Sequence, residues 1–304
     1  MRFRILVLFL FAGLALCPTL ARAQLKIFAC VPEWAALAQE LGGDKVSVTL
    51  AAGALQDPDK VEVTPQLLVK VREAALAVCT GPLEADWLPS VLRRAANVNV
   101  RIGTPGYFAA AGYVRMMAVP TSEAGGKEHA HSAGHPHIQT DPRNVRAVAV
   151  QLGRRMGQID AANAAYYSER TQAFVTRLDA AIKRWEAQAA PLKGIKIISQ
   201  HNNLDYLFAW LGIELVGTVE ITSGQAPPPA HLSKIVDIAT AQRIRLVANG
   251  VYEDQKSARF VADRAKVPLV SLAFTVGGNA ASKDIISLFD DMIGQMLKAH
   301  RGGA

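Results

Sequence analysis

Histidines are concentrated in one short stretch of this 304-residue chain. Four of the seven lie within nine residues, namely His129, His131, His135 and His137, and the other three are scattered downstream. Neutral imidazole is a common protein ligand for zinc and other borderline divalent ions. So dense a cluster in a histidine-poor chain predicts metal-binding chemistry, of which it would supply one part.

Two further polar motifs follow apolar runs that are typical of strands. Gln56-Asp57-Pro58-Asp59 comes after one run, and Ser199-Gln200-His201 comes after another. Zinc takes about four ligands, so His137 and His201 could supply imidazoles and Asp59 a carboxylate. The fourth position stays open among Glu220, His135, Glu253 and a water molecule. A structural interpretation also exists, because Asp-Pro-Asp is a turn signal and a single histidine after a strand is often a hydrogen-bonded loop residue.

Strand-like and helical segments alternate in both halves of the chain. The expected strands of the first half are residues 25–30, 46–51 and 76–79, and those of the second half are 195–199, 214–219, 246–248 and 269–272. This alternation favours an α/β fold of two Rossmann-like lobes, each a parallel sheet flanked by helices. Because such sheets bind ligands beyond the carboxyl ends of their strands, the polar motifs would face a cleft between the lobes.

A helical tract over about residues 161–189 separates the two halves. It has no internal glycine or proline, and its apolar residues recur at helical spacing. A coiled-coil partner would suit it, but we favour a rigid spacer, because the pattern does not continue as heptads. The expected division is an N-terminal α/β lobe over residues 24–159, a linking helix over 160–190 and a C-terminal α/β lobe over 191–304.

The first residues have the pattern of an export signal. Arg2 and Arg4 precede an apolar run, and Ala21-Arg22-Ala23 is a small-x-small cleavage site. We expect a signal peptide over residues 1–23, cleaved after Ala23, rather than a membrane anchor, because the run is shorter than the ~20 residues of a span. Cleavage removes three arginines and no acid, so the formal net charge falls from +7 to +4. So small a charge, without a basic stripe, argues against nucleic-acid binding.

Two cysteines remain after that cleavage. Cys30 and Cys79 each close a short apolar run. If the runs are neighbouring parallel strands, the thiols could meet at one sheet edge and form a disulfide in an oxidising compartment. The alternative is a pair of buried free thiols that pack as small apolar side chains, and the sequence leaves both open.

Motifs spread over the whole chain carry a resemblance to a known family. They are Val31-Pro32-Glu33-Trp34, Gln56-Asp57-Pro58-Asp59, Thr80-Gly81-Pro82-Leu83-Glu84 with Trp87-Leu88, Pro136-His137 with Asp141-Pro142-Arg143-Asn144, His201 with Tyr206-Leu207 and Trp210-Leu211-Gly212, and Thr275-Val276-Gly277-Gly278 with Lys283-Asp284 and Leu288-Phe289-Asp290. In this combination they resemble the metal-binding solute receptors of bacterial zinc and manganese ABC transporters. The resemblance implies two α/β lobes joined by one long rigid helix, with the ligand site in the cleft.

The resemblance also implies roles for individual residues. His137 and His201 match the family's second and third metal ligands. Asp59 stands where the family normally has a histidine directly after Asp-Pro, and residues 272–276 lack the acid that many members use as a fourth ligand. A carboxylate in place of an imidazole makes the donor set harder. A harder set tolerates manganese better, although the intrinsic affinity of the site still favours zinc.

These observations predict a monomeric periplasmic solute-binding protein. It would capture Zn²⁺, or Mn²⁺, through Asp59, His137 and His201 and deliver it to an ABC transporter permease in the inner membrane. The loop over residues 129–137 would concentrate ions near the cleft. One alternative is a receptor-fold protein with a degraded metal site that acts as an accessory or adhesion module. The other is a zinc hydrolase, although the chain has no His-Glu-x-x-His or Gly-x-Ser-x-Gly motif.

Overall fold

Two four-stranded parallel sheets form the framework of the protein. The computed structural model describes residues 23–118 and 134–302. The first sheet has the order β2-β1-β3-β4 and the second the order β6-β5-β7-β8. The strands of the first sheet are β1 (Leu25–Ala29), β2 (Val46–Leu50), β3 (Leu76–Cys79) and β4 (Tyr107–Ala109). Those of the second are β5 (Lys196–Ser199), β6 (Glu214–Thr218), β7 (Leu246–Gly250) and β8 (Leu269–Leu272).

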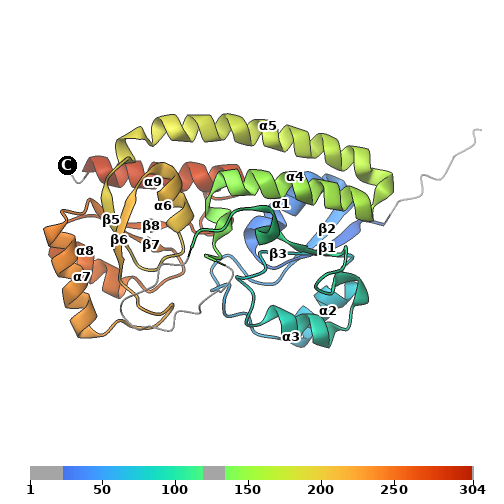
Figure 1. Ribbon diagram of the computed structural model, residues 1–304, viewed down its shortest axis with the longest axis horizontal. Helices are drawn as coiled ribbons and strands as arrows, with labels where there is room; N and C mark the ends of the chain where they lie inside the picture. Colours follow the sequence, from blue (N-terminus) through green and yellow to red (C-terminus); the bar gives the residue numbers. More distant parts are fainter. Residues whose placement is uncertain (1–22, 119–133, 303–304) are drawn as a thin grey trace, which may run out of the picture.

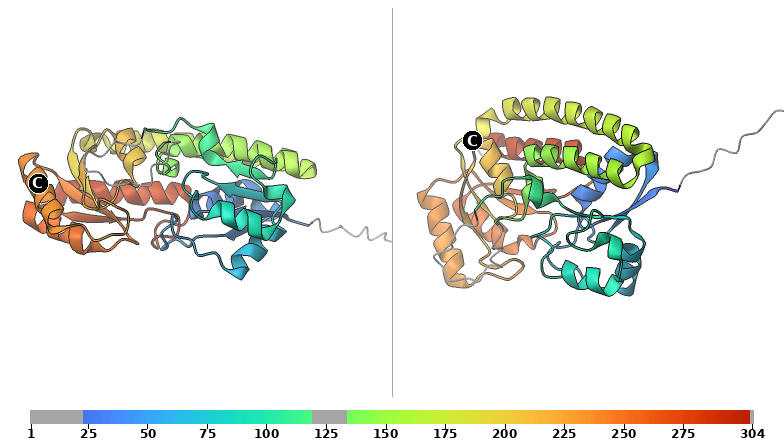
Figure 2. Two further views of the ribbon diagram at one scale, coloured as in Figure 1. Left: turned by 60° about the horizontal axis from the view of Figure 1, so that its bottom comes forward. Right: turned by 45° about the vertical axis from the view of Figure 1, so that its right-hand side comes forward.

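Helices cover the sheets and define two lobes, which confirms the predicted fold class (Figure 1). The first lobe carries α1 (Pro32–Gly42), α2 (Pro65–Glu73), α3 (Leu88–Ala95) and α4 (Pro142–Ile159). The second carries α6 (Asp205–Leu211), α7 (Pro229–Ala241), α8 (Gln255–Ala265) and α9 (Ile285–Gly302). The long helix α5 (Ala164–Gln188) runs along both lobes with α4 and α9 beside it, and Figure 2 shows all three on one side of the molecule.

Local signals fix where helices α2 and α4 begin. Thr64 caps α2 by accepting a hydrogen bond from the Leu67 backbone N–H, and Asp141 caps α4 by accepting one from the Arg143 N–H. Each cap is followed by proline at the first helical position, where the missing N–H costs nothing. The α4 cap fixes the end of the segment that carries His137.

One apolar core is shared by the two lobes on the α5 side. A continuous cluster of buried side chains includes Leu76 of the first sheet, Trp185 of α5, and Leu246 and Met292 of the second lobe. Smaller clusters fill the opposite faces, one under α2 and α3 and one under α7 and α8. The lobes are therefore joined by shared burial as well as by α5.

The short strand β4 is the main element that the sequence did not predict. It has three residues and follows a run of turns, so it has no alternating pattern of its own. The expected export signal and His129 and His131 lie outside the described residues, and the predicted lobe boundaries stay a prediction. No helix within residues 23–118 and 134–302 has the length and apolarity needed to cross a membrane.

Candidate metal centre

His137 and His201 come from opposite lobes and lie close together. His137 directly precedes the 3-10 turn Ile138–Thr140 and is 4% exposed. His201 lies two residues beyond the end of β5. Their ring centroids are 6.4 Å apart, with the ring planes at 85°. The structure therefore brings together the two imidazoles that the sequence predicts as ligands of one ion.

The His201 imidazole is held in the form that binds metal. Burial lowers its pKa from 6.5 to about 4, because an imidazolium is poorly solvated in the cleft. The Asp57 carboxylate opposes this shift in pKa, and the Lys60 ammonium adds to it. The ring is therefore neutral at pH 7, and neutral imidazole is the metal-binding species.

The carboxyl group of Asp59 is buried among other acids. Its Oδ1 atom has no hydrogen-bond partner in the described part of the chain. Burial raises the pKa of Asp59 to about 7, and the charges of Asp57, Glu84 and Asp86 act in the same direction. A divalent cation at this position would offset both the lost solvation and the mutual repulsion of the carboxylates.

The three predicted ligands are not at coordination distance from one another. Over residues 23–118 and 134–302, one group of three side chains has all its potential donor atoms within 4.8 Å of one another, and it consists of Cys30, Cys79 and Glu84. The two cysteines of this group are joined in a disulfide, so they offer no thiolate to a metal. Asp59, His137 and His201 do not form such a group. Their side chains would have to move closer to hold one ion at the ~2.0–2.2 Å that zinc requires.

The side chains considered for the fourth position differ in their surroundings. Both carboxyl oxygens of Glu220 and of Glu253 accept hydrogen bonds from neighbouring groups of the second lobe. The buried ring of His135 lies 5.5 Å from that of His137, and its Nε2 is 3.5 Å from a carboxylate oxygen of Asp205. A carboxylate commonly orients a metal-binding histidine in this way. The surroundings of His135 therefore suit a ligand better than those of the two glutamates.

An anionic cavity of about 390 Å³ opens between the lobes beside these residues. Its lining includes Asp57 of the first lobe and Gln200, Glu220 and Glu253 of the second. None of its described lining residues is Lys, Arg or His. A cleft lined by one sign of charge concentrates ions of the opposite sign, so this cavity favours cations.

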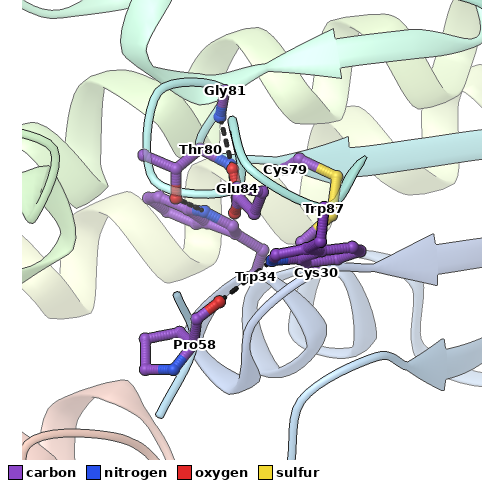
Figure 3. Close-up of a disulfide and its surroundings, with 8 residues drawn as sticks. All are labelled: Cys30, Trp34, Pro58, Cys79, Thr80, Gly81, Glu84 and Trp87. Carbon is purple, nitrogen blue, oxygen red and sulfur yellow. Dashed lines mark hydrogen bonds between the residues drawn. A yellow bond between two sulfur atoms is a disulfide. The ribbon is translucent and has the colours of Figure 1, made fainter. Parts of the chain in front are cut away.

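A disulfide joins the two strands at the centre of the first sheet (Figure 3). Cys30 directly follows β1, and Cys79 is the last residue of β3. Their Cα atoms are 4.9 Å apart. The structure thus decides between the two alternatives for these cysteines in favour of the disulfide. It ties together the carboxyl ends of β1 and β3, next to which the site is built.

Hydrogen bonds extend from this edge to the loop that carries Asp59 (Figure 3). The buried Glu84 carboxylate accepts the backbone N–H groups of Thr80 and Gly81, at 2.9 and 2.7 Å. Trp87, three residues later, donates from Nε1 to the carbonyl oxygen of Pro58 at 3.0 Å. The peptide bond that precedes Asp59 is therefore anchored to the disulfide-linked edge.

Two further side chains of the site were missed by sequence reasoning. The charge of Asp57 raises the pKa values of Asp59 and His201, two of the predicted ligands. Its position in the Asp-Pro-Asp motif could have marked it as part of the site. The Phe274 ring lies 5.5 Å from that of His137. No local pattern marks Phe274 as different from a core phenylalanine.

Known proteins with related sequences are metal-uptake components. Over 130 residues the chain is 25% identical to the high-affinity zinc uptake system protein ZnuA of Brucella abortus, which is 43% of this chain and 39% of that protein. It is also 21% identical over 286 residues to the metal ABC transporter substrate-binding lipoprotein ScbA of Streptococcus cristatus, which is 90% of this chain and 89% of that protein. The first match thus spans well under half of the relative's length.

Solved structures share the fold at low sequence identity. A crystal structure of ZnuA matches with a TM-score of 0.76 and 20% identity, over 92% of this chain and 100% of that chain. Residues 27–299 match the family described as ZnuA, zinc-uptake complex component A, periplasmic. The chain therefore belongs to the family of the periplasmic zinc-uptake complex component A.

Proposed function

We propose that the protein captures a single divalent cation, Zn²⁺ first and Mn²⁺ second, in the cleft between its lobes. Asp59, His137 and His201 would hold the ion as transported cargo. The observation that carries this proposal is the approach of two imidazoles from opposite lobes to a centroid distance of 6.4 Å. A ligand that binds both rings at once must lie between the lobes. Because it binds the folded state, it would raise the free energy of unfolding.

The donor set supports zinc with some tolerance for manganese. Two imidazoles and a carboxylate are borderline-to-hard donors, and all three are ligands that zinc accepts. The acidic side chains of Asp57, Glu220 and Asp254 around the cleft would attract the ion without binding it directly. His135, supported by Asp205, is the side chain that we assign to the fourth position.

The cargo would pass to an ABC-type permease. This step rests on family membership, because ScbA is named as the substrate-binding lipoprotein of a metal ABC transporter. We further infer export to the periplasm by the signal over residues 1–23, and action as a monomer. A pull-down from membranes with the zinc-loaded protein tests this partner. Recovery of an ABC-type permease supports the proposal, and its absence contradicts it.

Zinc titration of metal-free protein tests the site. We expect His137→Ala or His201→Ala to weaken zinc binding at least about 100-fold, since loss of one ligand leaves too few donors for a stable site. His231→Ala is the matched control, because His231 lies in α7 and contacts the Thr218 carbonyl instead of the cleft. Unchanged affinity in either ligand variant would refute the assignment.

Elemental analysis of natively purified protein separates this function from the accessory or adhesion alternative. One equivalent of zinc or manganese per chain, lost in His137→Ala, supports the transport receptor. Metal-free protein whose melting temperature does not respond to either ion would favour a receptor fold that no longer carries metal.

A further inference from the structure

A buried carboxyl group at the start of α1 has no basic partner among the residues that the structure describes. Glu33 lies in the first turn of α1 and is 2% exposed, and its Oε1 has no hydrogen-bond partner within the described residues. Burial is the largest influence on its pKa, which rises to about 7, and none of the influences comes from a basic side chain. A carboxyl group buried in this way either keeps its proton or takes up a cation.

Two other buried oxygens share the position of Glu33. Gln139 is 2% exposed and Thr275 is 5% exposed. Gln139 Oε1 completes no hydrogen bond in the described part of the chain, and the Thr275 hydroxyl makes none there other than a weak one to the Glu33 carboxyl group. Buried polar atoms are normally hydrogen-bonded, so incompletely satisfied oxygens gathered in one place require a reason.

All three side chains line one small cavity. Its volume is about 10 Å³, which is room for roughly one water-sized particle. The Thr275 hydroxyl is near enough to the Glu33 carboxyl group to lower its pKa, although burial outweighs this effect. Glu33 belongs to the first lobe and Thr275 follows β8 of the second, so the cavity lies where the lobes meet.

The chemistry of the cavity differs from that of the zinc site. A carboxylate, an amide and a hydroxyl are hard oxygen donors, and no imidazole or thiolate lines the described walls. Other walls are apolar, among them Val31, Pro32 and Phe274, which strengthens electrostatic attraction inside. Such a set suits an s-block cation better than a transition metal.

We propose that Glu33, Gln139 and Thr275 form a second cation site, specific for a small hard ion, which links the two lobes. Sodium is the first choice, because the single carboxylate balances one positive charge. Calcium is the second choice, and it would need additional oxygen ligands. The site shares no ligand with the proposed zinc site, although Pro58 and Phe274 of its wall adjoin Asp59 and His137.

Thermal unfolding of the zinc-free full chain tests the proposal. Melting temperature is measured in choline chloride and at increasing NaCl or CaCl₂, with ionic strength held constant. We expect one of the two ions to raise the melting temperature progressively with its concentration, as binding to the folded state requires. The response to sodium or to calcium identifies the ion.

Variants connect that response to the cavity. Glu33→Gln should abolish the ion-specific shift, and Thr275→Val should move the half-maximal concentration at least about tenfold higher while keeping the carboxyl group. Glu169→Gln, an exposed change on α5, is the matched control and should respond like the wild type. Zinc titration of the same variants should be unchanged, which distinguishes this site from the zinc site.

Two results would overturn the proposal. If neither sodium nor calcium raises the melting temperature above that in choline chloride, Glu33 simply keeps its proton. If Glu33→Gln and Thr275→Val both respond like the wild type, the ion binds elsewhere. Should Glu33→Gln fail to fold, Thr275→Val alone carries the comparison.

Discussion

Reduction of the Cys30–Cys79 disulfide should cost the metal-free protein about 4 kcal/mol of unfolding free energy. The bond closes a loop with a sequence separation of 49 residues. Chain-entropy estimates for loops of this size fall between about 3 kcal/mol for 15 residues and about 4.7 kcal/mol for 100. Such a loss would remove a large part of the 5–15 kcal/mol that is typical of a folded domain.

Urea unfolding of the oxidised and reduced forms of one sequence measures this loss. Both cysteines are fully buried, so reduction is carried out on unfolded protein, which then refolds with reductant present. Free thiols counted under denaturing conditions establish the redox state. The variant Cys30→Ala/Cys79→Ala is the control, because its urea midpoint should not respond to reductant at all.

A difference below about 1 kcal/mol between the two forms would refute this reasoning. It would mean that the reduced unfolded chain already holds residues 30 and 79 near each other, or that the folded sheet resists the bond. A changed slope with urea would reveal the first of these, because a more compact unfolded state exposes less surface on unfolding.

Three other predictions follow from the site and its supports. Asp59→His should tighten zinc binding in calorimetric titration, since it restores the family's imidazole; weaker binding would show that Asp59 serves another ion or is not a ligand. Trp87→Phe should cost about 1–3 kcal/mol in urea unfolding by leaving the Pro58 carbonyl unsatisfied, and should weaken zinc binding; Trp210→Phe, which loses a hydrogen bond to an exposed glutamate, is the control and should leave zinc affinity unchanged. In choline buffer, Glu33 should contribute a fall of about 3 kcal/mol in unfolding free energy between pH 4.5 and about 7, because over this window folded Glu33 keeps a proton that the unfolded chain has lost. The buried acids Asp59 and Glu253 add falls of the same sign. The total fall should therefore be smaller by about 3 kcal/mol in Glu33→Gln, and an equal fall in both proteins would contradict this role of Glu33.

Much of the fold is written in local sequence signals. Thr64-Pro65 and Asp141-Pro142 each combine a capping side chain with proline, and both helices begin where these pairs predict. The strand–helix alternation likewise predicts the two parallel sheets, since the central strands β1, β3, β5 and β7 are short and mostly buried apolar runs. The strand β4 was not predicted, because three residues are too few to show an alternation of apolar and polar side chains.

The site was predictable only where a motif marks it. His137 and His201 stand out by residue type and by position after a strand or before a capped helix. Glu33, Gln139 and Thr275 are spread over more than 240 residues, and each one alone reads as an ordinary buried polar side chain. Their convergence depends on how the lobes meet, which is tertiary information that no local pattern contains.

The apolar core that continues from one sheet to the other has a consequence for how such proteins can diversify. Leu76, Trp185 and Met292 belong to one packed unit, although they come from different parts of the chain. A single lobe separated at α5 would expose its part of this apolar core to water. Two related proteins therefore cannot exchange one lobe as an independent unit. A chimaera would fold only if the helices α4, α5 and α9 came from the same parent as both of the surfaces that they cover.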